Sequence, residues 1–377
     1  MRILVLRAAS QNNVLSRMAE QLFAGLDLPD VERDLLDLQG VDRAACLAAL
    51  EARLAAFRPD HVVSFAGFTA DFAAELYDRF ACGLVGWDVD HPAYQFDRFV
   101  AGPARRLQVC ASASHAAFRQ RIGFKGGSAL MLPGVATVSE QAPSIAERPV
   151  GVSLAMSWIG EPEVWWARFK GKPVHDLIEG MVERVLADDA ADLLRAFDAV
   201  TRDRGMNLPI DRSVASIFAN VGLFVRRYDR LRLAQALAAS DLPCTLHGEG
   251  WEGRLASAGG LTFEPSVDFA DCAAAYGRAR VVLNLNAANG GSERAVTAMA
   301  AGAAVVSDFS PLLAEEFGAG RAIAFFRRAD PASVVETLAS LEDPAAAQTM
   351  ADAGRARVAE AHTWPAKAAA LVEALRT

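Results

Sequence analysis

The residues best suited to chemistry follow a buried apolar strand that ends at Leu283–Asn286, in the second half of the chain. Two glycines, Gly290 and Gly291, come next, and Ser292 then stands at the N-cap position of a helix. Glycine lets the backbone approach a ligand closely, and a helix N-terminus offers N–H groups and the positive end of a dipole. This pattern predicts an anion site, for instance for a diphosphate, although an ordinary strand-to-helix turn has the same pattern.

A second candidate group lies in the first half, directly after the predicted strand 83–87. It contains two carboxylates and an imidazole, Asp88, Asp90 and His91, which could share the role of a general base acting on a hydroxyl. The alternative is a turn in which an aspartate caps the chain before Pro92. Asp88 and Asp90 also form a D-x-D pattern of the kind that holds a metal and a diphosphate, but three residues are a weak match. We expect no metal.

Composition excludes several classes of protein. A chain of 377 residues is long enough for two domains, and its 52% hydrophobic and 22% charged residues are typical of a packed globular protein. A net charge of −8 argues against a nucleic-acid partner. The apolar run 295–306 is too short to cross a membrane, and the five scattered cysteines fit reduced thiols. We therefore expect a cytoplasmic protein without an integral membrane segment.

Short apolar strands alternate with helical patterns along both halves of the chain, which indicates parallel sheets covered on both faces. In the first half the predicted strands are 2–7, 61–65, 83–87, 108–111 and 129–132, and in the second half 150–156, 245–247, 281–284 and 304–306. The expected fold class is α/β, with two Rossmann-like doubly wound domains facing a cleft. The predicted domains are 1–145, 146–361 with a helical insertion at about 160–225, and a final helix 362–377 that packs back on the first domain.

Four motifs in the second half occur in a characteristic order. They are Gly248-Glu249-Gly250-Trp251 after a strand, Tyr276-Gly277-Arg278-Ala279-Arg280, the segment Val281–Pro311, and His362-Thr363-Trp364 at the start of the last helix. From about Arg227 to the C-terminus, this order resembles the donor-binding half of GT-B glycosyltransferases. The resemblance is strongest to the CgeB-like (spore maturation protein-like) group.

The resemblance implies roles for the residues around the glycine loop. Gly290, Gly291 and Ser292 would lie against the diphosphate of a nucleotide sugar. Arg294 would pair with a phosphate oxygen, for which the guanidinium fork is well matched. Glu293 would hold the donor sugar or Arg294 itself.

The same resemblance places Gly248 and Trp251 near the nucleotide base or the ribose, with core packing as the alternative for Trp251. Retaining GT-B enzymes carry two glutamates eight positions apart, and the second holds the ribose hydroxyls. Here Asn289 and Thr297 stand at those two positions. Ribose recognition by a carboxylate is therefore not expected, and Asn289 or another group would have to replace it.

The predicted activity is transfer of a sugar from a nucleotide-sugar donor to a hydroxyl of a glycan, lipid or protein. The enzyme would be hexosyltransferase-like and metal-independent, with a UDP-sugar as the favoured donor and no further cofactor. Two alternatives remain open at this point. One is a sugar-nucleotide epimerase of the same fold, and the other is a non-catalytic protein that binds nucleotide sugars as a partner.

Overall fold

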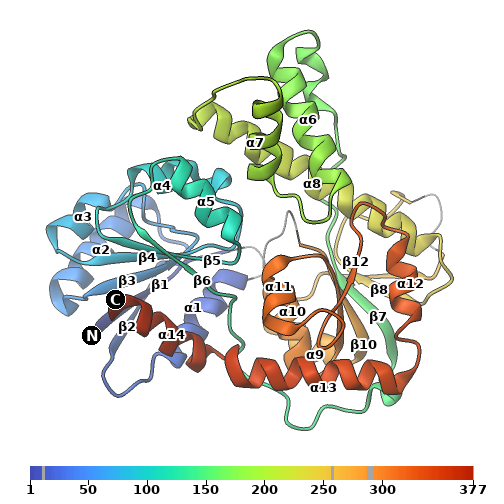
Figure 1. Cartoon of the computed structure of the whole chain (residues 1–377). Helices are drawn as coiled ribbons and strands as arrows, with labels where there is room; N and C mark the ends of the chain where they lie inside the picture. Colours follow the sequence, from blue (N-terminus) through green and yellow to red (C-terminus); the bar gives the residue numbers. More distant parts are fainter. Residues whose placement is uncertain (11–12, 256–258, 287–291, 377) are drawn as a thin grey trace. The chain divides into compact units, whose positions relative to one another are not determined.

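The computed structural model describes residues 1–10, 13–255, 259–286 and 292–376, and the chain forms two compact units (Figure 1). Unit 1 comprises Met1–Ala136, Pro209–Ala215 and Glu360–Thr377. Unit 2 comprises Thr137–Leu208 and Ser216–Ala359. The chain therefore returns to unit 1 twice, first at residues 209–215, where a long helix begins, and again at the C-terminal end of the chain. The domain limits expected from the sequence stay a prediction.

Unit 1 is built on a parallel sheet with the strand order β2-β1-β3-β4-β5-β6. Its strands are β1 (Arg2–Arg7), β2 (Glu32–Asp37), β3 (His61–Phe65), β4 (Gly83–Trp87), β5 (Arg106–Cys110) and β6 (Gly127–Leu130). Its helices are α1 (Val14–Gly25), α2 (Arg43–Phe57), α3 (Ala74–Arg79), η2 (Pro92–Gln95), α4 (Phe96–Ala101), α5 (Ala113–Arg121) and α14 (Trp364–Arg376). The central strands β3 and β4 are buried along their whole length, as continuous apolar strands of a sheet covered on both faces should be.

Unit 2 repeats this plan with the strand order β12-β11-β10-β7-β8-β9, again parallel throughout. Its strands are β7 (Val150–Ala155), β8 (Cys244–His247), β9 (Leu261–Glu264), β10 (Ala279–Asn284), β11 (Ala304–Asp308) and β12 (Ala324–Phe326). Its helices are η3 (Ile145–Glu147), η4 (Trp165–Phe169), α6 (Pro173–Ala187), α7 (Leu193–Asp203), α8 (Arg212–Ala238), α9 (Cys272–Gly277), α10 (Glu293–Ala300), α11 (Pro311–Phe317), α12 (Ser333–Ala339) and α13 (Pro344–Ala361). The two-sheet α/β architecture expected from the sequence is confirmed.

The last helix, α14, lies against α1 within unit 1 (Figure 1). Trp364, at its first turn, is 1% exposed and donates its indole N–H to Gln21 Oε1 at 2.7 Å. The same ring meets Trp87 of β4 edge-on, with 5.4 Å between the ring centroids. One buried aromatic side chain thus ties the C-terminal helix to the sheet of unit 1.

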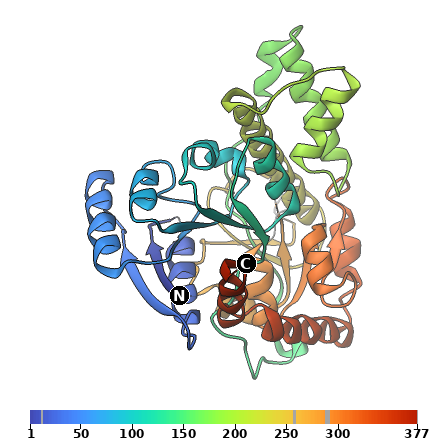
Figure 2. The same ribbon diagram turned by 60° about the vertical axis from the view of Figure 1, so that its left-hand side comes forward.

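Within unit 2, α6 and α7 pack on each other and project beyond the sheet, and we call this pair the helical arm (Figures 1 and 2). Both helices are amphipathic and bury their apolar faces, with Ile178 and Met181 of α6 and Phe197 of α7 almost fully covered. Whether residues 160–225 are an insertion into the second domain stays a prediction. Among the described residues, no helix is long and apolar enough to span a membrane.

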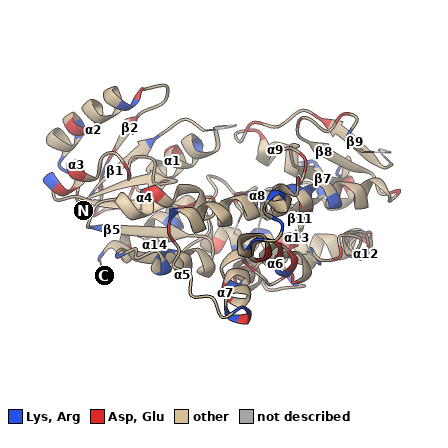
Figure 3. Ribbon diagram, turned by 90° about the horizontal axis from the view of Figure 1, so that it is seen from above, with Lys and Arg blue, Asp and Glu red and all other residues tan. Residues whose placement is uncertain are grey.

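Charged side chains of both signs are distributed along the helices of each unit, as Figure 3 shows. The net charge of −8 likewise argues against binding to a nucleic-acid backbone, which usually requires a broad basic face. Any site for a phosphate group must therefore be a local cluster of cations, and the carboxyl ends of the strands are the place to look for it.

Candidate functional site

Helix α10 begins at the carboxyl end of the sheet of unit 2. Ser292 is its N-cap: the residue is extended, and its hydroxyl oxygen accepts a hydrogen bond from the Arg294 N–H at 3.1 Å. The N-cap expected from the sequence is therefore present, while the contact of Ser292 with a diphosphate stays a prediction. Asn289, Gly290 and Gly291 lie outside the described residues.

Arg294 is connected to the sheet through buried polar side chains at the ends of two adjacent strands. Its Nη1 donates to Asn284 Oδ1 at 3.4 Å, and Asn284 Nδ2 donates to Ser307 Oγ at 2.9 Å. Ser307 also accepts from Asn286 Nδ2 at 3.2 Å and donates to Asp308 Oδ1 at 3.3 Å. The Ser307 hydroxyl thereby uses one donor and two acceptor sites, its full capacity. This network orients Asn284, which in turn orients Arg294.

Two further arginines belong to the same electrostatic site, both from helix α8. Arg230 Nη1 donates to the carbonyl oxygen of Ser157, just beyond strand β7, at 2.5 Å. The pKa of Arg230 is lowered to about 9, mainly because burial penalises its charge and further because the positive charges of Arg226 and Arg294 lie nearby. The charges of Arg226 and Arg294 thus act on that of Arg230, and we call Arg226, Arg230 and Arg294 the arginine cluster.

Within the arginine cluster, Arg230 is the residue whose positive charge is disfavoured by its surroundings. Like charges and burial both oppose ionisation, and the lowered pKa of Arg230 records that opposition. A bound anion would relieve both effects, and guanidinium groups bind phosphate oxygens through two parallel hydrogen bonds. Sequence reasoning identified Arg294 but missed Arg226 and Arg230. Their spacing, one helical turn apart on the same helix, was the available signal.

Behind the cluster, two buried carboxylates share one arginine. Asp308, in β11, accepts the backbone N–H of Asn286 at 2.7 Å, and Asp229 Oδ2, in α8, lies 3.7 Å from Arg328 Nη1. Burial raises the pKa of each aspartate to about 7, and the positive charge of Arg328 opposes that rise in both. The pair of Asp229 with Arg328 thus joins α8 to the segment that follows β12.

The two remaining predicted donor residues of α10 have different surroundings. Thr297 is 9% exposed, and its hydroxyl donates to the carbonyl oxygen of Glu293, one turn earlier, at 2.8 Å. Thr297 therefore turns back onto its own helix in this structure. Glu293 is half-buried in the first helical turn, where a carboxylate is favoured by the helix dipole. Donor contacts through either side chain stay predictions.

Gly248 and Trp251 join the ends of β8 and β7. A Cβ atom at Gly248 would lie 2.3 Å from the carbonyl oxygen of Met156, so only glycine fits this close approach. Trp251 is 1% exposed, donates its indole N–H to the same oxygen at 2.6 Å and packs edge-on against Trp158. Trp251 is thus a core residue here, and contacts of Gly248 and Trp251 with a base or ribose stay predictions.

In unit 1, Asp88 is buried at the end of β4 and forms an ion pair with Arg119, which is 0% exposed. The side-chain amide of Gln108 also donates to Asp88. Burial lowers the pKa of Arg119 to about 9. Asp88 is therefore engaged in a structural pair inside unit 1, in addition to any role in catalysis predicted for it.

Asp90 and His91, the other two predicted base residues, differ in exposure. Asp90 is exposed, whereas His91 is 9% exposed and its Nδ1 accepts the Ala93 N–H at 3.1 Å, capping η2. The pKa of His91 lies well below its ordinary value because the ring is buried, and the neighbouring His115 lowers it further. His91 is therefore neutral at pH 7, with a low affinity for protons.

Across the part of the chain that the structure describes, no three His, Cys, Asp or Glu residues converge in a group that could hold a metal ion. At the D-x-D pattern, Asp88 is paired with Arg119, and Asp90 is exposed.

Comparison with known proteins gives a family match for part of the chain and a fold match for all of it. Residues 226–373 match a protein family described as "Glycosyl transferase-like". No curated protein matches the chain. The matched residues include the whole arginine cluster, both buried aspartates and Trp251.

Solved structures of similar fold cover the whole chain. Sucrose-phosphate synthase from Thermosynechococcus elongatus is 14% identical, with a TM-score of 0.56 over 100% of this chain and 98% of its own. HepE from Anabaena, solved with UDP-glucose, is 12% identical, with a TM-score of 0.59 over 99% and 100%. AviGT4, a glycosyltransferase of avilamycin A biosynthesis, is 13% identical, with a TM-score of 0.52 over 100% and 97%. The fold is thus the GT-B architecture, which confirms the fold class expected from the sequence.

Proposed function

We propose that this protein is a glycosyltransferase that transfers a sugar from a UDP-sugar to a hydroxyl group of a glycan, lipid or protein. The observation that carries the proposal is the arginine cluster, in which Arg294 lies in the first turn of α10 and Arg226 and Arg230 belong to α8. The "Glycosyl transferase-like" match over this region supports it, as does a UDP-glucose complex of a protein with the same fold. The order of the four sequence motifs further supports membership of the CgeB-like group.

The chemistry follows from charge. The acceptor oxygen attacks the anomeric carbon of the donor sugar, the bond from that carbon to the diphosphate oxygen breaks, and UDP leaves with the electron pair. In this proposal the arginine cluster and the N–H groups of the α10 N-terminus stabilise the negative charge that develops on the leaving diphosphate. These fixed cations take the place of a metal ion, so the enzyme is metal-independent.

The acceptor proton needs a base, and the proposal assigns it to unit 1. Asp90 is the preferred residue because it is exposed. His91 is the second choice, since its lowered pKa makes it a weaker base. Asp88 serves mainly to hold Arg119 and the end of β4.

Isothermal titration calorimetry with UDP, UMP and uridine tests the proposal. Arg294→Ala and Arg230→Ala each remove a guanidinium from the cluster and should weaken UDP binding about tenfold or more, while uridine binding changes little. The matched control is Arg232→Ala, which removes the same charge from α8 outside the arginine cluster. UDP affinity should be unchanged by EDTA. Undiminished UDP binding by both cluster variants would refute the role of the cluster, and no UDP binding by the wild type would refute the proposed function.

A further inference from the structure

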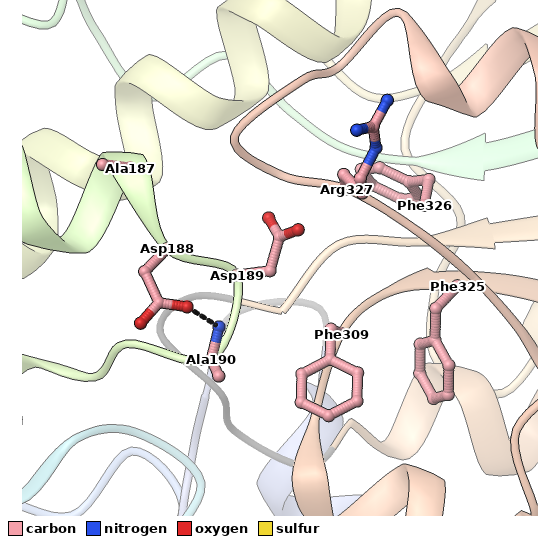
Figure 4. A pocket seen from close by; sticks show the side chains of 8 residues that line it. All are labelled: Ala187, Asp188, Asp189, Ala190, Phe309, Phe325, Phe326 and Arg327. Atoms are coloured by element: carbon pink, nitrogen blue, oxygen red, sulfur yellow. Dashed lines mark hydrogen bonds between the residues drawn. The ribbon is translucent and has the colours of Figure 1, made fainter.

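A pocket of about 500 Å³ opens beside the carboxyl end of strand β11, wholly within unit 2 (Figure 4). Its volume lies in the range of small-molecule sites. It is lined by Ala187, Asp188, Asp189, Ala190, Phe309, Phe325, Phe326 and Arg327. None of these residues belongs to the arginine cluster, and no motif in the sequence pointed to the pocket.

The two walls of the pocket carry different chemistry. Phe309 and Phe325 form an aromatic wall; their rings meet edge-to-face, with 5.4 Å between centroids, and both are half-buried (Figure 4). The opposite wall is the loop that follows α6, which supplies Asp188 and Asp189 (Figure 4). One oxygen of each carboxylate already accepts a backbone N–H, that of Ala190 for Asp188 and that of Ala329 for Asp189. A ligand at the pocket would therefore have the aromatic rings on one side and the remaining carboxylate oxygens of the loop on the other.

The walls are held in a fixed relation by hydrogen bonds beneath them. Asp189 Oδ1 accepts the Ala329 N–H at 2.8 Å, and Arg328 donates through Nη2 to the carbonyl oxygens of Val185 and Asp188. Arg328 is 5% exposed, so these bonds are shielded from water. The base of the helical arm is therefore fastened to the strand that carries Phe325. A preformed pocket loses less entropy when a ligand binds.

The lining residues exclude some ligands. Two carboxylates on one wall disfavour an anion, and a wholly apolar ligand would remove them from water without replacing their hydrogen bonds. A neutral ring with hydroxyl groups suits both walls, because its C–H face packs on aromatic rings and its hydroxyls donate to carboxylates. A pyranose has this chemistry. A cation would also suit the carboxylates, but Arg327, which pairs with Asp330, adds a positive charge at the rim.

The pocket is connected directly to the candidate donor site. Phe309 follows Asp308, whose carboxylate binds the backbone N–H of Asn286. Strand β11, which ends there, is hydrogen-bonded to β10, the strand that carries Asn284. A ligand against Phe309 therefore lies at the end of the strand next to the one that supports Arg294.

We propose that this pocket binds a pyranose ring of the acceptor, which makes the base of the helical arm an acceptor-recognition element. The proposal rests on the proposed function, because an acceptor exists only if the protein is a transferase. It gives that enzyme a glycan or glycolipid acceptor with a sugar unit held between Phe309 and the Asp188–Asp189 loop. The binding residues come from the same unit as the donor site.

Saturation-transfer NMR tests this directly, with the methyl glycosides of glucose, galactose, mannose and N-acetylglucosamine as probes. At least one glycoside should receive saturation from the wild-type protein, and Phe309→Leu and Phe325→Leu should each lower that signal at least about fivefold, because leucine keeps apolar volume but offers no ring face. The control is Phe169→Leu, which replaces another half-buried, edge-to-face phenylalanine of unit 2 away from the pocket. No signal with any of the four glycosides, or equal signals in the two pocket variants and the control, would overturn the proposal.

Separate readouts keep this proposal distinct from the proposed function. Phe325→Leu should leave UDP affinity unchanged, and Arg294→Ala should leave the glycoside signal unchanged. If Phe325→Leu weakened UDP-glucose but not UDP, the pocket would hold the donor sugar, which overturns the acceptor assignment. Stronger saturation of choline than of any glycoside, lost in Phe325→Leu, would assign the pocket to a cation and equally overturn it.

Discussion

The two units place charged side chains at equivalent positions, the carboxyl ends of parallel strands, but they balance those charges differently. In unit 1, Asp88 at the end of β4 is buried in an ion pair with Arg119. In unit 2, burial lowers the pKa of Arg230, and the positive charges of Arg226 and Arg294 lower it further. Unit 1 pairs its buried arginine with a carboxylate, whereas in unit 2 the buried Arg230 donates to a backbone carbonyl oxygen.

This difference shows that the fold locates a site without determining its chemistry. A parallel sheet directs the ends of its strands to one edge in both units, but the buried arginine is paired with a carboxylate in unit 1 and with a backbone carbonyl oxygen in unit 2. The sequence suggests a catalytic role for Asp88 because this residue follows a buried strand. In the folded protein Asp88 is itself buried, and it is paired with Arg119. The charge balance of a cluster is therefore better evidence for binding than the residue types in it.

The largest expected effect comes from breaking the internal pair of unit 1. Asp88→Ala leaves Arg119 charged and buried without its partner, which should cost about 3–5 kcal/mol. Hydrogen exchange should show faster exchange in peptides of unit 1, with unit 2 as the internal reference. The control is Glu51→Ala, which breaks an exposed pair with Arg79 and should cost less than about 1 kcal/mol.

Replacing both members of the pair sharpens the comparison. Asp88→Leu combined with Arg119→Met removes both charges and should recover most of the stability. If the double variant were as unstable as Asp88→Ala, the loss would come from packing or from Gln108 rather than from the unpaired arginine. In contrast, Arg294→Ala leaves the buried Asn284 Oδ1 without this donor but creates no buried unpaired charge, so it should cost unit 2 only about 1 kcal/mol.

A fall in pH should change the stability of the two units in opposite directions. The pKa of His115 is lowered to about 4 by burial, so between about pH 4 and 6.5 the unfolded state binds more protons and unit 1 loses stability as the pH falls, by up to about 3 kcal/mol. The pKa values of Asp229 and Asp308 are raised to about 7, so between about pH 4 and 7 the folded state binds more protons and these groups stabilise unit 2 as the pH falls.

Hydrogen exchange at pH 7 and pH 5, corrected for intrinsic rates, measures this contrast in each unit. His115→Gln should reduce the acid sensitivity of unit 1, and Asp229→Asn should reduce the gain of unit 2 at low pH. An equal loss of protection in both units on acidification, unaffected by either variant, would contradict the assignment of the pH response to these buried groups.

The sequence predicted the central strands well and missed three of the four edge strands, with β6 as the edge strand that it did predict. Strands β1, β3, β4, β7, β10 and β11 are continuous apolar runs, which burial on both faces requires. The three strands missed, β2, β9 and β12, all lie at sheet edges. Strand β2 reads Glu-Arg-Asp-Leu-Leu-Asp, and only Leu36 is fully buried, because an edge strand remains open to solvent on one side.

For the candidate site, the sequence predicted where the site lies in the chain but not all of the residues that form it. The N-cap at Ser292 and the following helix could be predicted because they depend on local chain geometry. The contribution of Arg230 could not, because it comes from a helix more than sixty residues away in the sequence. The pairing of Asp88 with Arg119 was equally hidden, since neither residue indicates its partner before the sheet has formed.

The smallest expected effect tests whether the network behind Arg294 positions it for binding. Asn284→Ala removes the oxygen that accepts from Arg294 and the amide that donates to Ser307, but no charge. We expect UDP affinity to fall about fivefold to tenfold, because Arg294 must then be ordered on binding, whereas UMP, which lacks the β-phosphate, should lose much less. The control is Ser153→Ala, which alters another fully buried polar residue of the same sheet.

The ratio of UDP to UMP affinity separates positioning from a general loss of structure. A merely structural role for Asn284 would lower both affinities together and would be accompanied by faster exchange throughout β10. An unchanged ratio would therefore show that Arg294 needs no support from the sheet, and the arginine cluster would then resemble a set of independent surface charges. A selective loss for UDP would show that the buried network of unit 2 serves ligand binding, whereas the buried pair of unit 1 serves stability.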